Sequence, residues 1–273
     1  MSSFTSSYVD LPGFRTMLAQ VRVQTMAKYT TTPDELNKKA DGSPLAAIDL
    51  MNHEVLARTL PKLRDVPVFS EENYPEFSAR KKVDEYWLVD PLDGTKEFLS
   101  GVPEFTTLIA LIEGSRPVFS CILAPSTGTI YWAEEGEGAF HETDGQLAAF
   151  DLTTGPGGKS RGLISRNHPE AEVQAAYEAL GMTTFVHKGS ALKFAALVEN
   201  EADIYFRKRG PHEWDIAAGD LLVREAGGDL LCLATGGSLY YNQEQTRVAA
   251  FVATAPGTYL SPAEFQMFKK SAE

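Results

Sequence analysis

The chain has 273 residues, an apolar fraction of 43% and a formal net charge of −12 at pH 7. This length allows one large domain or two closely packed ones. The acidic balance argues against a nucleic-acid polymer as a partner, because duplex-binding proteins normally present a basic face.

No apolar run reaches the length of a membrane span. The polar start, Met1–Ser7, lacks the basic and apolar stretches of a signal peptide. We therefore expect a cytoplasmic protein. The two cysteines, Cys121 and Cys232, stand in apolar runs and are expected to be buried small side chains.

The first half of the chain predicts two helices followed by strands. Apolar residues at helical spacing predict a helix from about Tyr8 to Lys28. Ser43-Pro44 suits the start of a second helix, with a capping serine and a first-turn proline, and this helix continues toward Leu60. Apolar runs predict strands at 66–69, 86–89, 106–112, 117–123 and 129–133. The last three, separated by turns, are typical of an antiparallel meander.

The second half alternates strands and helices. The Gly-rich stretch 153–158 is the best candidate boundary, which gives subdomains of residues 1–152 and 153–273. Beyond it we expect strands at 162–165, 202–206 and 247–254, and helices at 170–180, 190–200, 214–225 and 262–270. The predicted fold class is α+β, or layered α/β.

Acidic residues gather where these strands are expected to end. Glu71 and Glu72 follow one strand, and Asp90 and Asp93 follow the next in the run Asp-Pro-Leu-Asp-Gly-Thr. Converging carboxylates repel one another unless a cation joins them. Oxygen ligands without a nearby histidine or cysteine favour Mg²⁺. A plain Asp-Gly turn beside a solvated loop is the alternative, and it is the weaker account once a later Trp-Asp pair, at Asp215, is added.

Two long motifs resemble the lithium-sensitive, inositol-monophosphatase-like phosphatases. The segment 87–98, Trp-Leu-Val-Asp-Pro-Leu-Asp-Gly-Thr-Lys-Glu-Phe, looks like their first signature, and 214–220, Trp-Asp-Ile-Ala-Ala-Gly-Asp, like their second. Segments 41–44, 68–72 and 225–228 also fit, in the same order. The resemblance implies a layered alternating α/β sandwich of the inositol monophosphatase and fructose-1,6-bisphosphatase type. The main metal motifs would lie in the first subdomain, and the substrate contacts and last metal ligand in the second.

Within the family, three segments resemble the CysQ branch, the 3′(2′),5′-bisphosphate nucleotidases. They are Lys96-Glu97-Phe98, 165–168 (Ser-Arg-Asn-His) and 189–194 (Gly-Ser-Ala-Leu-Lys-Phe). The branch implies hydrolysis of adenosine 3′,5′-bisphosphate to AMP and phosphate. Two alternatives stay open: a phosphatase for an inositol or sugar phosphate, and a catalytically weak Mg²⁺- or nucleotide-binding protein.

The resemblance also implies roles for individual residues. Two or three Mg²⁺ ions would be held by Glu71, Asp90, the Leu92 carbonyl, Asp93 and Asp215. Thr95 would orient the attacking water, with Asp49 or Glu72 as proton acceptor. The implied substrate contacts are the backbone of Gly94 and Thr95, and the side chains of Ser165, Arg166, His168, Ser190, Lys193, and Arg207 or Arg209. The plain rivals are a solvated basic face for the cations, a helix-capping role for His168, and a simple helix-start charge for Asp215.

One departure from the family pattern concerns the second helix. Ala46 stands where these phosphatases commonly have threonine, so one hydroxyl is absent near Asp49. His53 lies four residues beyond Asp49 on the same helical face and is either its partner or a core histidine. The assembly implied by the sequence is a monomer or a homodimer.

Overall fold

The computed structural model describes residues 6–29, 44–150, 159–167 and 171–273. Ser43, His168, the side chain of Ala46 and the candidate boundary at 153–158 lie outside this described part. In the described part, no helix has both the length and the apolar character needed to cross a membrane.

The first sheet has seven strands in the order β1-β2-β3-β4-β5-β6-β7. β1 pairs with β2 in parallel, and every later neighbour is antiparallel. The strands are β1 (Val68–Ser70), β2 (Glu85–Asp93), β3 (Thr106–Glu113), β4 (Arg116–Ala124), β5 (Thr129–Glu134), β6 (Gly138–Thr143) and β7 (Gln146–Ala149).

The second sheet has five strands in the order β11-β12-β10-β8-β9. β8 is parallel to both β9 and β10, whereas β12 is antiparallel to β10 and β11. The strands are β8 (Arg161–Ser165), β9 (Thr184–Lys188), β10 (Ile204–Arg207), β11 (Asp229–Cys232) and β12 (Phe251–Thr254).

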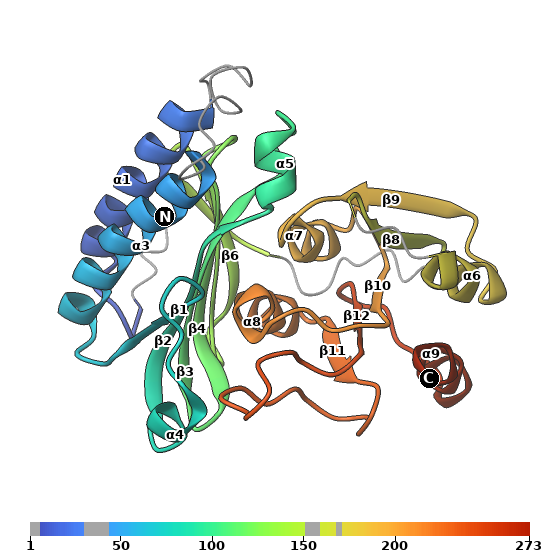
Figure 1. Ribbon diagram of the computed structural model, residues 1–273. Helices are drawn as coiled ribbons and strands as arrows, with labels where there is room; N and C mark the ends of the chain where they lie inside the picture. The colour runs from blue at the N-terminus through green and yellow to red at the C-terminus, as the bar shows by residue number, and fades with distance from the viewer. Residues whose placement is uncertain (1–5, 30–43, 151–158, 168–170) are drawn as a thin grey trace.

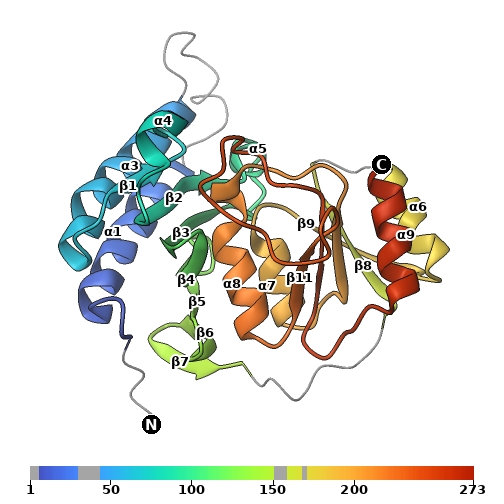
Figure 2. The ribbon, with the colours of Figure 1, turned by 90° about the horizontal axis from the view of Figure 1, so that it is seen from below.

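Helices form three layers around these two mixed sheets (Figures 1 and 2). The described helices are α1 (Leu11–Tyr29), α3 (Pro44–Leu63), α4 (Phe77–Arg80), α5 (Thr95–Leu99), α6 (Ala171–Ala179), α7 (Leu192–Val198), η1 (a 3₁₀ turn, Glu213–Asp215), α8 (Ala217–Glu225) and α9 (Pro262–Ala272). α1 and α3 cover the outer face of the first sheet, α7 and α8 lie between the sheets, and α6 and α9 cover the far face of the second sheet.

Alternation along β2 shows why the first sheet is buried on both faces. Trp87 and Val89 pack into the cluster beneath α1 and α3, and Tyr86 and Leu88 pack into the cluster that contains α7 and α8. Side chains of a strand alternate between faces, so a nearly continuous apolar run serves two cores at once.

The two mixed sheets and their helices confirm the expected α+β fold, including the predicted meander and its flanking helices. Both cysteines are free and buried, as expected. β6, β7, β9 and β11 were not predicted, and β12 begins only at Phe251. The first sheet ends at Ala149 and the second begins at Arg161, while the largest apolar cluster joins residues of both halves. The division into subdomains 1–152 and 153–273 stays a prediction.

Candidate active site

The carboxyl ends of β1 and β2 lie side by side because the two strands are parallel. Ser70 pairs with Val89, and the N–H of Glu71 donates to the Val89 carbonyl at 3.0 Å. Glu71 and Asp90 therefore emerge at the same edge of the sheet. The sequence predicted this meeting from strand ends alone.

A β-bulge corrects the expectation that the strand ends at Asp90. β2 runs on to Asp93. Asp90 pairs with Leu108 and Asp93 with Thr106, so β2 advances by three residues where β3 advances by only two. In a regular strand, residues three apart point to opposite faces. The extra residue of the bulge turns Asp93 to the face of Asp90, since a bulge shifts the alternation by one.

Side-chain contacts on the bulge agree with this register. Leu92 packs with Ile48, Phe98 and Phe105, while its N–H donates to the Asp90 carboxylate at 3.0 Å. The Pro91 carbonyl, which a regular ladder would pair, instead accepts from Asn52 at 3.1 Å and from Thr107 at 2.9 Å. The buried polar backbone of the bulge is thus satisfied by side chains.

Asp93 is held by the loop that precedes α7. Its Oδ2 accepts from the Ser190 hydroxyl at 2.5 Å and from the Ala191 N–H at 2.6 Å. Gly94 follows with φ of +89°, and a Cβ there would lie 2.9 Å from the Glu104 carbonyl oxygen. Only glycine fits this left-handed, crowded position without strain. α5 starts immediately after it at Thr95.

Asp215 comes from the other side of the cleft. The helix expected from Trp214 onward is divided, because η1 ends at Asp215 and α8 begins at Ala217. The Asp215 Oδ2 accepts the His212 N–H at 2.8 Å, which closes the η1 turn. Asp215 caps this turn and faces the acidic cluster at the same time.

Carboxyl oxygens of Glu71, Asp90 and Asp215 all lie within 4.8 Å of one another. Burial raises the pKa of Asp90 well above its usual value, and the charges of Asp93, Glu71 and Asp215 add to the rise. Burial, then the charge of Asp93, raises the pKa of Asp215 to about 8. Such a group is costly to ionise without a cation.

Glu72 and Asp49 lie next to this centre. Burial, then the charges of Glu72 and Glu71, raises the pKa of Asp49 to about 7. The pKa of Glu71 is also raised by burial of its carboxyl group and by Glu72 and Asp93, although the residue as a whole is exposed. Donors that are all oxygens, gathered in one place, fit a hard divalent cation such as Mg²⁺.

A cleft of about 750 Å³ opens beside the acidic cluster. Asp93 and Asp215 line one part of it, and Ser165 and Arg207, at the carboxyl ends of β8 and β10, line another. Ligands of α/β sheets commonly bind at the carboxyl ends of parallel strands. The volume lies in the range of small-molecule sites.

Cations gather on the side of the cleft formed by the second sheet. They are Lys193, Arg207, Lys208, Arg209 and Arg247, whereas Lys96 lines the cleft from α5, in the first half of the chain. Lys193 is buried, donates to the Ser190 carbonyl, and lies with Nζ 5.8 Å from the Tyr205 ring centroid. Its burial lowers its pKa. An acidic end and a basic side thus share one cavity.

The sequence-predicted site residues fall into three groups. Those that line the cleft are Asp93, Gly94, Thr95, Ser165, Ser190, Lys193, Arg207, Arg209 and Asp215. Glu71, Glu72, Asp49, Asp90 and Leu92 are not in the lining; they lie just after β1, in the first turns of α3 and at the bulge. Arg166 is not in the lining; it forms a double contact with Glu104, at 2.6 Å each. The Thr95 hydroxyl lies 3.4 Å from the Leu92 carbonyl.

Other residues of the cleft were missed. His212 and Arg247 line it, and the buried Glu213 directly precedes Trp214 in the chain. Glu213 stands just before the Trp-Asp motif and, taken alone, looks like an ordinary charged residue. Nothing in the local sequence points to Arg247, because the pairing of His212 with Arg247 across the chain brings it there.

Comparison with known proteins matches this architecture. A model of the inositol monophosphatase family matches residues 15–261. The 3′(2′),5′-bisphosphate nucleotidase CysQ of Escherichia coli K12 is 39% identical over 201 residues, 72% of this chain and 79% of that protein. The Haemophilus influenzae CysQ is 33% identical over 214 residues, covering 77% and 79%.

Solved structures agree in fold. A crystal structure of CysQ from Bacteroides thetaiotaomicron, described as a bacterial member of the inositol monophosphatase family, superposes with a TM-score of 0.81 at 29% identity. It covers 92% of this chain and 99% of its own. An inositol monophosphatase from Zymomonas mobilis shares the fold at 21% identity, with a TM-score of 0.72 and coverage of 98% and 99%.

Proposed function

The chain belongs to the inositol monophosphatase family and is a phosphomonoesterase of that family, and on this premise we propose that its substrate is a 3′(2′),5′-bisphosphate nucleotide. Adenosine 3′,5′-bisphosphate, hydrolysed to AMP and phosphate, is the expected reaction. The observation that carries the proposal is the cleft itself, in which an acidic cluster stands beside a basic side. A substrate with two phosphates fits this cleft, because one phosphate can lie at the acidic cluster and the other at the basic side.

The acidic cluster fits Mg²⁺ by its donor set. Glu71, Asp90 and Asp215 offer carboxyl oxygens within 4.8 Å, and we propose that Asp93 and the Leu92 carbonyl complete the ligands for two or three ions. The charges of Glu71 and Asp215 both add to the raised pKa of Asp90, and a bound cation would compensate this concentration of negative charge. Bound Mg²⁺ supplies positive charge for phosphate oxygens and makes a nearby water more acidic.

The chain's own residues hold the water and the phosphate. Thr95 sits at the start of α5 beside Asp93, where its hydroxyl can orient a water toward the cleft. Asp49, whose pKa of about 7 suits proton exchange near neutrality, would accept the proton, with Glu72 beside it. The backbone N–H groups of Gly94 and Thr95 would hold phosphate oxygens.

The basic side would hold the second phosphate. Lys193 and either Arg207 or Arg209 are the proposed contacts, since charge-assisted hydrogen bonds to phosphate are strong. Ser165 and Ser190, which also line the cleft, would contact the nucleotide. Arg166 would need to leave Glu104 to reach it, and His168 lies outside the described residues. Cytoplasmic location and a monomeric or homodimeric state stay predictions from the sequence.

Phosphate release from adenosine 3′,5′-bisphosphate and from inositol 1-phosphate, with and without Mg²⁺, tests the proposal. We expect hydrolysis that requires Mg²⁺ and a kcat/KM at least about tenfold higher for the nucleotide, because the second phosphate adds a charged contact. Equal or better turnover of the inositol ester would favour the inositol or sugar phosphatase. No hydrolysis of either ester would favour a binding protein.

An Asp93→Asn variant tests the ligand assignment. The amide oxygen can still accept from Ser190 and Ala191, so the loop contacts are retained while the charge is lost. We expect kcat/KM to fall about 100-fold or more at fixed Mg²⁺. Asp229→Asn, at an exposed position of β11, is the matched control and should keep wild-type turnover.

A further inference from the structure

Glu213 is a buried carboxylate that the proposed reaction does not use. It is 2% exposed and stands two residues before Asp215. Its Oε1 accepts from the Tyr74 hydroxyl, and its Oε2 accepts the Asn242 N–H at 2.7 Å. The Arg80 guanidinium lies 3.8 Å away. A carboxylate this deep needs such partners, since burying an unpaired charge is costly.

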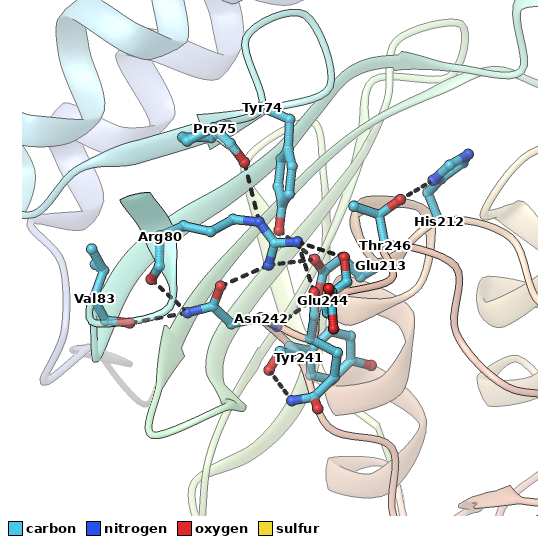
Figure 3. A network of polar contacts seen from close by, with 11 residues as sticks. Tyr74, Pro75, Arg80, Val83, His212, Glu213, Tyr241, Asn242, Glu244 and Thr246 are labelled. Carbon is cyan, nitrogen blue, oxygen red and sulfur yellow. Dashed lines mark hydrogen bonds and ion pairs between the residues drawn. The ribbon is translucent and has the colours of Figure 1, made fainter. Parts of the chain in front are cut away.

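Arg80 is equally buried and is fully engaged (Figure 3). Its Nε donates to the Pro75 carbonyl at 3.1 Å, and its Nη1 donates to the Asn242 side chain at 2.8 Å. Its Nη2 donates to the Gln243 carbonyl at 2.7 Å. The guanidinium also lies over the Tyr74 ring, 4.8 Å from its centroid. Only a planar, five-donor cation makes this set of contacts, so lysine is no substitute.

Asn242 closes the network. Its Nδ2 donates back to the carbonyls of Arg80 and Val83, at 3.0 and 3.2 Å. Its own φ of +62° turns the chain at this point. A few residues later, the Thr246 carbonyl accepts the Glu213 N–H at 2.8 Å. The segment that follows Tyr241 is therefore tied both to α4 and to η1 (Figure 3).

The two ends of this network lead to two different ligands of the acidic cluster. Tyr74 follows Glu71 by three residues, whereas Glu213 precedes Asp215 by two. Between them, Trp214 packs on Tyr74 with ring centroids 4.8 Å apart, and its indole lies close enough to the Glu71 carboxyl to offset part of the rise in the pKa of Glu71. The imidazole ring of His212 stacks on the ring of Trp214, with ring centroids 4.5 Å apart.

We propose that Arg80, Glu213 and Asn242 form a positioning clamp that fixes Asp215 relative to Glu71 and thereby sets the affinity of the acidic cluster for divalent cations. The three carboxylates of the cluster repel one another when ionised. Without the clamp, η1 can move away from the end of β1 and the charges separate. With it, the oxygens stay gathered before the cation arrives, so less of the binding free energy goes into ordering.

The inference rests on the proposed function, and cation binding tests it without a substrate. Binding of Mn²⁺, a cation that also suits carboxylate ligands, is measured from the free-ion electron paramagnetic resonance signal. Glu213→Gln keeps the shape and the Asn242 contact but removes the charge opposite Arg80. We expect its dissociation constant for Mn²⁺ to rise about tenfold or more, as for residues that orient metal ligands.

Asn242→Gly is the second variant, because glycine accepts the positive φ while the side-chain bridge to Arg80 is lost. It should weaken Mn²⁺ binding in the same direction, and it decides the question if Glu213→Gln does not fold. In both variants, raising the Mg²⁺ concentration should restore the rate of phosphate release. A merely structural role predicts no such rescue.

Asp203→Asn is the matched control. Asp203 is a buried partner of Arg161, with a contact of 2.5 Å, and it accepts the N–H groups of Ser160 and Arg161 at the amino end of β8. The cleft is at the opposite, carboxyl end of β8 and β10. Asp203→Asn should lower the thermal midpoint and leave Mn²⁺ affinity unchanged. If Glu213→Gln and Asn242→Gly lower the thermal midpoint but bind Mn²⁺ as tightly as the wild type does, the proposed clamp is wrong. If the wild type binds no Mn²⁺, the proposed metal centre falls first and the clamp with it.

Discussion

At the scale of single residues, the site depends on conformations that few side chains can adopt. Gly94 joins the last residue of β2 to the first of α5 with φ of +89°. Its missing side chain lets the Glu104 carbonyl and Ser190 approach. Asp93 on one side and Thr95 on the other are thereby aimed at the same cleft.

Gly94→Ala should be strongly destabilising and should lower turnover. We expect a loss of about 3 kcal/mol in the free energy of unfolding, from positive φ and from overpacking against Glu104 and Ser190. Urea titration measures it. Gly101→Ala is the control, because Gly101 has φ of +71° and nothing within 4 Å of the added Cβ. It should cost about 1 kcal/mol, and equal losses in the two variants would mean that the close approach is unimportant.

At the scale of elements, the bulge of β2 brings two aspartates to one face. Two buried polar side chains, Asn52 of α3 and Thr107 of β3, hold the bulge in place. Asn52 on α3 donates to the Pro91 carbonyl at 3.1 Å and to the Thr25 hydroxyl of α1 at 3.0 Å. It also accepts from Gln24 at 2.6 Å. One buried amide therefore joins both outer helices to the strand that carries the acidic motif.

Asn52→Ala should destabilise the protein by about 3 kcal/mol, because the Pro91 carbonyl and two side chains lose a buried partner. We also expect weaker turnover, since the bulge loses one of its two side-chain anchors. Thr107→Val removes the other anchor, at 2.9 Å, in nearly the same shape and should cost about 1 kcal/mol. Denaturant unfolding of both variants measures the difference, and a neutral Asn52→Ala would contradict this account of the bulge.

The elements also show how far the sequence reaches. Helix α1 was predicted because Phe14, Leu18 and Val21 recur at helical spacing, and all three are buried. The bulge could not be predicted, since it is defined only by the register of β2 against β3. β9 was missed because its polar residues are mostly half-buried or exposed and show no strand alternation.

The same limit applies to the site. Motifs at Asp90, Asp93 and Asp215 identify the acidic cluster, because each motif is local. Arg80 and Glu213 meet only through the tertiary fold, and each alone reads as an ordinary charged residue. Contacts between distant segments carry no local pattern, so the clamp could be found only from the structure.

At the scale of the whole molecule, a chain of net charge −12 concentrates several carboxyls in one place. Burial and mutual repulsion raise the pKa of Asp49 to about 7 and that of Asp215 to about 8, and they hold the pKa of Asp90 well above its usual value. In an unfolded chain these groups titrate near their ordinary values, around 4. The folded, metal-free protein therefore binds more protons than the unfolded chain between about pH 4 and 8.

The sign of the resulting pH dependence follows from linkage. A carboxyl group whose pKa is higher in the folded chain than in the unfolded chain stabilises the fold. This contribution is fully present at pH values below the pKa of the unfolded chain and is lost as the pH rises through the pKa of the folded chain. The metal-free protein should thus become less stable from pH 5 to pH 8, with a thermal midpoint lower by at least about 3 °C, the shift that corresponds to about 1 kcal/mol. Burial lowers the pKa of His212, so this residue makes the protein more stable as the pH rises. It is a single group, and several carboxyls act in the other direction.

Magnesium should reverse this trend, because it binds the ionised carboxylates. We expect 10 mM Mg²⁺, a concentration of about 10 times a millimolar dissociation constant, to raise the midpoint more at pH 8 than at pH 5. Thermal melts in a chelator and in Mg²⁺ at both pH values measure this difference. Asp215→Asn removes one of the titrating groups and should flatten the pH slope of the metal-free protein. A chelated wild type that gains stability from pH 5 to pH 8 would show that the carboxyls of the cluster are not held together in the folded chain.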